Sequence, residues 1–215
     1  MDEICYLNIV PEEIIKYIIS FTKNKVFDLC LVNKYFDNNC KIIKIISNFD
    51  YPKLANINLK RLTNLVSLNL KNNNIITDDG IKVLINLTFL GLSSNDIITD
   101  EGIKELTNLT SLNLFCNKEI TDEGIKGLIN IKFLDLFNNN KITDKGIKRL
   151  TYLTSLDLCK NKIITDKGIK GLTNLTSLNL YYNEIITDEG MKDLINLTSL
   201  NLTCNRIITN KGIKG

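Results

Sequence analysis

The sequence contains no histidine among its 215 residues. Histidine is the most common general base in enzymes, so its absence excludes a Ser-His-Asp or Cys-His catalytic arrangement. It also removes a frequent zinc ligand, and none of the six cysteines forms a C-x-x-C pair. We therefore expect a protein that is not an enzyme and that holds no metal or other cofactor.

A long apolar run is missing as well, so no segment is expected to span a membrane. The start, MDEICYLNIVPEE, is acidic where a secretory signal would be basic. The net charge of +3 is too small to indicate nucleic-acid binding. Free thiols fit the scattered cysteines, and this favours a reducing compartment. We expect a cytoplasmic protein, in a host cytoplasm if its source is an intracellular parasite or virus, without nucleic-acid, membrane or small-molecule partners.

What the sequence does have is a repeat of 22 residues. Asparagines stand at 73, 95, 117, 139, 161, 183 and 205, and glycines stand at 80, 102, 124, 146, 168, 190 and 212. Leu-x-Leu pairs keep the same spacing from Leu68/Leu70 to Leu200/Leu202. No insertion or deletion breaks the register, and a weaker leading copy contains Leu59 and Leu62.

Each column of the repeat predicts a structural role. Leu-x-Leu indicates a short strand with one buried face, and the column from Ile76 to Ile208 is always isoleucine, which predicts core. Thr77 and Asp78, with their equivalents, are typical of the start of a short helix. The asparagine amide can donate and accept, so a stack of asparagines can satisfy backbone groups at a bend. One strand and one short helix cannot bury a core alone, so the copies must stack.

The pattern L-x-x-L-x-L-x-x-N-x-I resembles the leucine-rich repeat family from about residue 54 to the end. The segment ITDEGIKGL is similar to repeats of F-box and leucine-rich-repeat proteins, and LTNLTSLNL is similar to bacterial internalin repeats. The resemblance implies an α/β fold: a curved solenoid with a parallel concave sheet and short convex helices, preceded by a small helical bundle. We place the bundle at 1–50 and the solenoid at 51–215, with about seven repeats after a partial leading one.

Three columns are expected to point out of the concave sheet in every repeat. They carry several aromatic residues, namely Phe89, Phe115, Phe133, Phe137 and Tyr181. Clustered exposed aromatics on a rigid sheet are typical of a protein-binding hot spot. We predict that they form a partner-binding site. The alternative is that these rings cover one another and bind nothing.

Two acidic residues, Asp135 and Asp157, occupy neighbouring positions of one outward column, and we include them in the predicted partner site. Paired carboxylates can perform acid–base catalysis. The simpler interpretation, which we favour, is that they are solvated neighbours of Asn113 and Asn179 in the same column.

A regular basic stripe is expected on the helices, running from Lys82 to Lys214. Such a stripe could meet anionic lipid or nucleic acid. We favour the alternative that the aspartates from Asp78 to Asp188, one turn away, neutralise it.

The first 50 residues do not repeat. The segments VPEEIIKYIISFT, VFDLCLVNKYF and CKIIKII predict three apolar helices. Their residues resemble an F-box between about Ile9 and Ile46, although Thr22, Asn33 and a shortened spacing depart from that pattern. The resemblance implies binding of a Skp-type adaptor through six residues: Val10, Pro11, Ile14, Ile18, Leu29 and Val32.

Together the two parts resemble the substrate receptor of a Skp–cullin–F-box ubiquitin ligase. Such a receptor binds its target on the repeats and raises the local concentration of target near the ligase. The alternative is a stand-alone interaction protein, an effector or scaffold, in which the N-terminal bundle only caps the solenoid.

Overall fold

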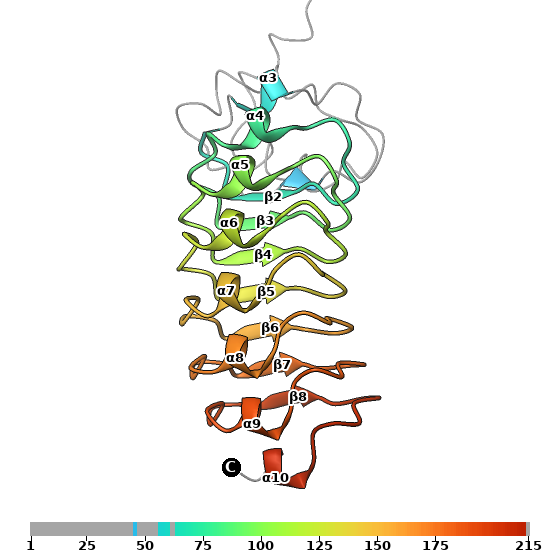
Figure 1. Cartoon of the computed structure of the whole chain (residues 1–215). Helices are drawn as coiled ribbons and strands as arrows, with labels where there is room; N and C mark the ends of the chain where they lie inside the picture. Colours follow the sequence, from blue (N-terminus) through green and yellow to red (C-terminus); the bar gives the residue numbers. More distant parts are fainter. Residues whose placement is uncertain (1–44, 47–55, 61–62, 214–215) are drawn as a thin grey trace, which may run out of the picture.

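A computed structural model describes residues 45–46, 56–60 and 63–213 of the chain (Figure 1). The F-box-like segment, including every predicted adaptor-binding residue, lies outside these residues apart from Ile45 and Ile46. None of the helices within these residues has the length and apolar character that a membrane span requires.

The strands form one parallel sheet in which the spatial order follows the chain order. They are β1 (Ile45–Ile46), β2 (Ser67–Asn69), β3 (Phe89–Gly91), β4 (Ser111–Asn113), β5 (Phe133–Asp135), β6 (Ser155–Asp157), β7 (Ser177–Asn179) and β8 (Ser199–Asn201). From β2 onward the pairing places equivalent residues side by side, for example Leu112 beside Leu134. The constant repeat length therefore produces a constant register.

A column of one-turn helices runs beside the sheet (Figure 1). They are α3 (Asn56–Leu59), α4 (Asp78–Ile81), α5 (Asp100–Ile103), α6 (Asp122–Ile125), α7 (Asp144–Ile147), α8 (Asp166–Ile169), α9 (Asp188–Met191) and α10 (Asn210–Ile213). The predicted threonine cap is present in α5 to α10, where for example the Thr99 hydroxyl accepts from the Glu101 N–H at 3.3 Å, but Thr77 makes no such bond before α4. This architecture confirms the predicted α/β leucine-rich-repeat solenoid.

One predicted helix is wrong at its end. The segment CKIIKII was expected to be helical, but Ile45 and Ile46 form strand β1, which pairs with β2. The physical reason is the free edge of β2, whose backbone groups would otherwise lack a sheet partner. Isoleucine is β-branched, so it adopts the strand conformation readily.

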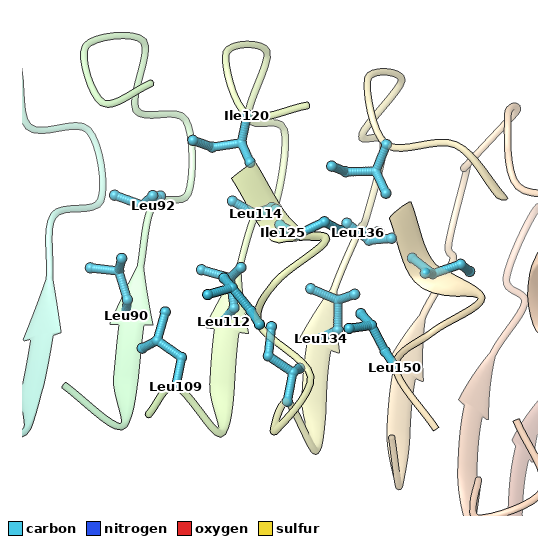
Figure 2. Packing of buried hydrophobic residues seen from close by; sticks show 14 of the residues in the cluster. Leu90, Leu92, Leu109, Leu112, Leu114, Ile120, Ile125, Leu134, Leu136 and Leu150 are labelled. Atoms are coloured by element: carbon cyan, nitrogen blue, oxygen red, sulfur yellow. The ribbon is translucent and has the colours of Figure 1, made fainter. Parts of the chain in front are cut away.

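The core lies between the sheet and the helix column. Leucines from the strands and isoleucines from the bends and helices interdigitate from one repeat to the next (Figure 2). Most are fully buried, such as Leu114, Ile120 and Ile125, each with 0% of its surface exposed. In the last repeat, Leu200, Leu202 and Ile208 are only partly buried.

The predicted asparagine stack is present inside this core. Asn117 is 1% exposed and donates to the carbonyls of Leu92, at 3.1 Å, and Asn95, at 2.7 Å, both in the preceding repeat. Its side-chain oxygen accepts from the N–H groups of Glu119 and Ile120 in its own repeat. Each such side chain therefore ties two repeats together and closes the bend after the strand.

The helix aspartates make a second tie between repeats. The Asp100 carboxylate accepts from both the backbone N–H and the hydroxyl of Thr121, at 2.8 and 2.5 Å. This contact also accounts for the glycine column: a Cβ on Gly124 would lie 2.4 Å from the Asp100 carboxylate. A larger residue there would collide with the atoms that join the repeats.

Candidate functional site

The structure places the predicted aromatic residues on the concave face at several strands. Phe89 and Phe133 lie in β3 and β5, where Phe89 pairs with Ser111 and Ser111 pairs with Phe133. Phe133 is 52% exposed. In the described part of the chain neither Phe89 nor Phe133 makes a ring contact, because Ser111 separates them.

Phe115 and Phe137 are brought together. They follow β4 and β5, and their rings stack with centroids 4.3 Å apart and planes 13° apart. Both rings are half-buried, so one side remains open to solvent. The stack fixes the orientation of both rings, and this lowers the entropy that a partner would have to remove on binding.

Sequence reasoning missed two members of this cluster, Lys160 and Tyr182. The Lys160 ammonium lies 5.7 Å from the ring centroid of Phe137 and 5.8 Å from that of Tyr182, which makes two cation–π contacts. Tyr182 in turn meets Tyr181 edge-on at 4.7 Å and is 48% exposed. The result is a continuous row of contacts, here called the aromatic row, in which Lys160 joins two pairs of rings: Phe115 and Phe137 on one side, Tyr182 and Tyr181 on the other.

The two residues that the sequence analysis did not include, Lys160 and Tyr182, lie at the turn that follows each strand. Lys160 and Tyr182 belong to a column with positive φ at every repeat, at 53° and 50° for these two residues. The left-handed conformation turns the chain sharply after the strand, and at this turn Lys160 reaches the rings of Phe137 and Tyr182 while Tyr182 meets Tyr181. A column that varies in sequence at such a turn is therefore a source of surface contacts.

Two residues in one of the columns expected to point out of the concave sheet are buried instead. Ser93 and Cys159 are 7% and 2% exposed, although they share a column with Phe115, Phe137 and Tyr181. The Ser93 hydroxyl turns inward and donates to Asn113 at 2.7 Å. Cys159 is small and stands between Phe137 and Tyr181 in the column. Burial first, and then the Asp157 charge, raises the pKa of the Cys159 thiol to about 11, which keeps it protonated and weakly nucleophilic at neutral pH.

Asp135 and Asp157 are paired in the sheet, as predicted. Asp135 accepts from the Phe137 N–H and the Asn113 amide, both at 2.9 Å. Asp157 accepts from the Cys159 N–H and the Asn179 amide, both at 2.8 Å. All four carboxylate oxygens are therefore engaged in bonds that support the turn, and this favours the structural interpretation over acid–base chemistry.

Burial is the main influence on the protonation of Asp135. It raises the pKa of this carboxyl above its ordinary value, and the negative charge of Asp157 acts in the same direction. The hydrogen bonds from Phe137 and Asn113 lower the pKa and oppose the burial only in part. The ionised form of Asp135 is therefore less favoured in the folded protein than that of an exposed carboxylate.

On the helix side, the expected partner of the lysine stripe is wrong. Lys104 pairs with Glu101 at 2.7 Å, and Lys82, Lys126 and Lys192 pair with acidic residues at the same relative position. The column from Asp78 to Asp188 was expected to do this. Those carboxylates are instead bonded to threonines of the next repeat, because the threonine N–H and hydroxyl both point at them.

No group of three or more potential metal ligands occurs within residues 45–46, 56–60 and 63–213. The three cysteines of the described chain, Cys116, Cys159 and Cys204, are free thiols, as predicted.

Comparison with known families agrees with the repeat geometry. A leucine-rich repeat model matches residues 61–85, 83–107, 105–129 and 127–150, and a second leucine-rich repeat model matches residues 151–207. The chain belongs to the leucine-rich repeat family. The matched region coincides with the solenoid, and no F-box model matches the chain. No curated protein matches it significantly.

Several solved structures share the fold. An internalin (inlF) from Listeria monocytogenes is 29% identical with a TM-score of 0.51, and the match covers 71% of this chain and 52% of that one. Internalin C2 of the same organism is 28% identical with a TM-score of 0.56, covering 71% of this chain and 74% of that one. This chain therefore spans about half of the first internalin and three quarters of the second.

Two further structures are complexes. A structure of the Rad7 and Elc1 complex in yeast matches with a TM-score of 0.61 over 80% of this chain and 52% of that one, at 21% identity, which shows the fold alone. A structure of a TLR13–ssRNA13 complex is 30% identical with a TM-score of 0.58, covering 73% of this chain and 24% of that one. Leucine-rich repeat proteins of this kind thus serve as interaction modules.

Proposed function

We propose that the concave face of this leucine-rich repeat protein binds a protein partner through the aromatic row. The observation that carries the proposal is the Phe115–Phe137 stack, continued through Lys160 to the two tyrosines. Aromatic side chains supply a large contact area with few rotatable bonds, and they dominate hot spots. Phe133, Asp135 and Asp157 lie on the strands beside the row, and Phe89 lies on β3.

We further propose that the protein is the substrate receptor of a Skp–cullin–F-box-type ubiquitin ligase in the cytoplasm. The support is the order of F-box-like residues in the N-terminal segment, from Val10 and Pro11 to Leu29 and Val32. Receptor function needs two separate surfaces, one for adaptor and one for target, and the repeats can supply the second. The likeness to the Rad7–Elc1 structure adds only a shared fold at this level of identity.

The competing proposal is a stand-alone interaction protein without a ubiquitin role. One observation favours it: the family models match the repeats only, and two of the solved structures with similar repeats are internalins. In this case the N-terminal segment covers one end of the solenoid and binds no adaptor.

The concave site is tested with Phe115→Ala/Phe137→Ala. Proteins retained by the immobilised wild-type chain should be identified, and each purified partner titrated against wild type and variant. Hot-spot truncations commonly cost about 2 kcal/mol each, so the double variant should weaken binding more than about a hundred-fold. The matched control is Val83→Ala/Ile85→Ala, which removes exposed apolar side chains outside the concave columns, at 40% and 54% exposure. Equal binding by wild type and the phenylalanine variant would refute the site.

The adaptor surface is tested with a purified Skp-type adaptor. Pro11 lies where a helix is expected to begin, so Pro11→Ala, alone or with Val10→Ala, should weaken capture with little change in thermal stability. Ile14→Ala should weaken capture and also lower stability, because the sequence places it on the apolar stripe. A folded wild-type chain that binds no adaptor at micromolar concentration leaves the stand-alone proposal in place.

A further inference from the structure

The series of lysine ion pairs along the helix column is interrupted at two helices in the middle of the solenoid, α7 and α8. In α4, α5, α6 and α9 the stripe lysine pairs with the acidic residue three positions earlier. In α7 and α8 that earlier position is a lysine, Lys145 or Lys167. Within the described chain, neither Lys148 nor Lys170 has an ion pair. These two lysines therefore lack the ion pair that their equivalents make, although Lys170 adds to the lowering of the Glu189 pKa that Lys192 mainly causes.

The free charges gather on neighbouring helices, because α7 and α8 lie side by side (Figure 1). We define the basic patch as five exposed side chains: Lys145, Lys148, Arg149, Lys167 and Lys170. The nearest helix carboxylates, Asp144 and Asp166, make no ion pair with it in the described chain, since their oxygens accept from Thr165 and Thr187.

One edge of the patch is hollowed. An open hollow of about 430 Å³ between α6 and α7 is lined by Lys141, Lys145 and Arg149 on the α7 side. On the α6 side it is lined by Thr121 and Asp122, and by Glu123 and Lys126, which pair with each other. The lining carries four basic and two acidic side chains, so its net charge is positive and the space can accept an anionic side chain.

The extent of the patch limits what can bind there. Residues 141–170 contain eight Lys/Arg and three Asp/Glu, whereas residues 78–127 contain four Lys/Arg and nine Asp/Glu. On the other side, α9 and its flanks carry Glu184, Asp188, Glu189 and Asp193 against Lys192. An extended polyanion lying along the solenoid would be repelled on both sides, since like charges are unfavourable at short range.

We propose that the basic patch on α7 and α8 binds a short acidic segment, rich in Asp and Glu, of a protein partner. A segment that crosses the two helices meets five exposed cations that make no ion pair within the described chain, and Arg149 can bind a carboxylate through two N–H groups. The site is separate from the aromatic row, so one chain can engage an acidic segment and a concave partner independently.

The repeats supply an unusually conservative test. Lys145→Glu/Lys167→Glu installs the residue type that α5, α6 and α9 already carry and recreates their ion pairs with Lys148 and Lys170. The probe is a fluorescently labelled peptide of about twelve glutamates, measured by anisotropy at low salt. We expect saturable one-to-one binding by wild type, weakened by added salt and at least about ten-fold weaker in the variant.

Three further arms keep the result specific. Lys71→Glu/Lys118→Glu makes the same change in net charge at exposed lysines away from α7 and α8, and it should bind as wild type. The reverse exchange, Glu101→Lys/Glu123→Lys, should strengthen binding by placing a second basic surface on α5 and α6. Phe115→Ala/Phe137→Ala should leave peptide binding unchanged, which separates this site from the concave one.

The proposal is overturned if Lys145→Glu/Lys167→Glu binds the peptide as tightly as wild type, or if the Lys71/Lys118 control loses binding equally. It is also overturned if an oligouridylate or a vesicle of phosphatidylserine binds more tightly than the peptide. A wild-type dimer that the Lys145/Lys167 variant converts to monomer would instead assign the patch to a second copy of the chain.

Discussion

Two columns of mostly polar residues line the turn after each strand. One column is the same residue in every repeat, whereas the other varies. The buried column is asparagine in every described repeat: Asn73, Asn95, Asn117, Asn139, Asn161, Asn183 and Asn205. The concave column varies: Asn69, Gly91, Asn113, Asp135, Asp157, Asn179 and Asn201. The buried side chain must donate to the preceding repeat and accept within its own. In the concave column the bond that recurs is one in which the side chain accepts from the backbone N–H two residues later.

This difference explains which substitutions occur. A carboxylate accepts hydrogen bonds but cannot donate them when ionised, so aspartate can replace asparagine in the concave column only. At Asp135 and Asp157 the neighbouring amides of Asn113 and Asn179 turn toward the carboxylates and supply the donor. The invariance of a column therefore reflects how many different bonds its side chain makes, and the concave column is free to carry charge.

The largest expected effect comes from removing the side chain of each column in turn within one repeat. Asn117→Ala would remove the partner of three backbone groups, namely the N–H groups of Glu119 and Ile120 and the Asn95 carbonyl, while the Leu92 carbonyl would keep its bond from the Asn95 N–H. At roughly 1–2 kcal/mol for each of the three groups, the loss should reach about 4 kcal/mol. Asn113→Ala removes the bonds from the Phe115 N–H and the Ser93 hydroxyl and the bond to Asp135, but all three are only part-buried, so it should cost less, about 2 kcal/mol. Urea titrations of both variants compare them directly, and equal losses would contradict the interpretation.

The next effect separates packing from hydrogen bonding beneath the concave column. Leu134 and Ile142 are 2% and 0% exposed, so truncation of either to alanine leaves a cavity in the core. Each change should destabilise the fold by about 2–5 kcal/mol, with little further change in the aromatic row. The same urea titration measures this loss, and a value below about 1 kcal/mol would mean that neither side chain packs as described.

A smaller effect of opposite sign is expected at Asp135. Because its pKa is raised, its protonated form favours the folded state; that stability is complete below the ordinary carboxyl pKa and is lost as pH rises through the folded value. Asp135→Asn should therefore stabilise the protein at neutral pH, by about 0.5 kcal/mol after allowance for solvent screening. Thermal melts between about pH 4 and 7 should show a smaller decrease for the variant than for wild type. Asn113→Asp, which adds a third adjacent carboxylate, should act in the opposite direction.

The smallest effect concerns the outer surface of the helices. Lys148→Ala removes an exposed and unpaired side chain and should change stability by less than about 0.5 kcal/mol. Lys126→Ala removes one member of the ion pair with Glu123, and exposed pairs of this kind contribute a similarly small amount. A loss above about 2 kcal/mol at either site would show that the lysine stripe supports the fold.

Much of the solenoid could be predicted because its interactions recur at one spacing. The Leu-x-Leu strands, the isoleucine column, the threonine caps and the asparagine stack all follow from local chemistry and the 22-residue period. The role of the helix aspartates was assigned incorrectly because their threonine partners lie 21 residues away, while the lysines are close in sequence. The helical spacing predicted that each aspartate pairs with the lysine four residues later. In the stacked repeats the aspartate instead accepts hydrogen bonds from a threonine of the next repeat.

The candidate site was predicted in part. The columns identified Phe115 and Phe137 as neighbours, but the burial of Cys159 and the inclusion of Lys160 depend on the sizes of adjacent side chains and on a left-handed turn. Neither can be calculated from the period alone. The break in the ion-pair stripe is visible as Lys145 and Lys167 in the sequence, yet it acquires meaning only once Glu101 and Glu123 are seen to be the usual partners.

The direction of the ties between repeats has an evolutionary consequence. In the buried asparagine stack and in the aspartate–threonine ties, the donor lies on the later repeat and the acceptor on the earlier one. Each interior repeat therefore presents the same set of acceptors to its successor and the same donors to its predecessor. A duplication or deletion of one whole 22-residue unit preserves every such pairing, whereas the insertion or deletion of a single residue misaligns the pairings of its repeat. Unequal recombination can thus lengthen or shorten this surface in whole repeats, and new binding residues can then arise in a copy that is already folded.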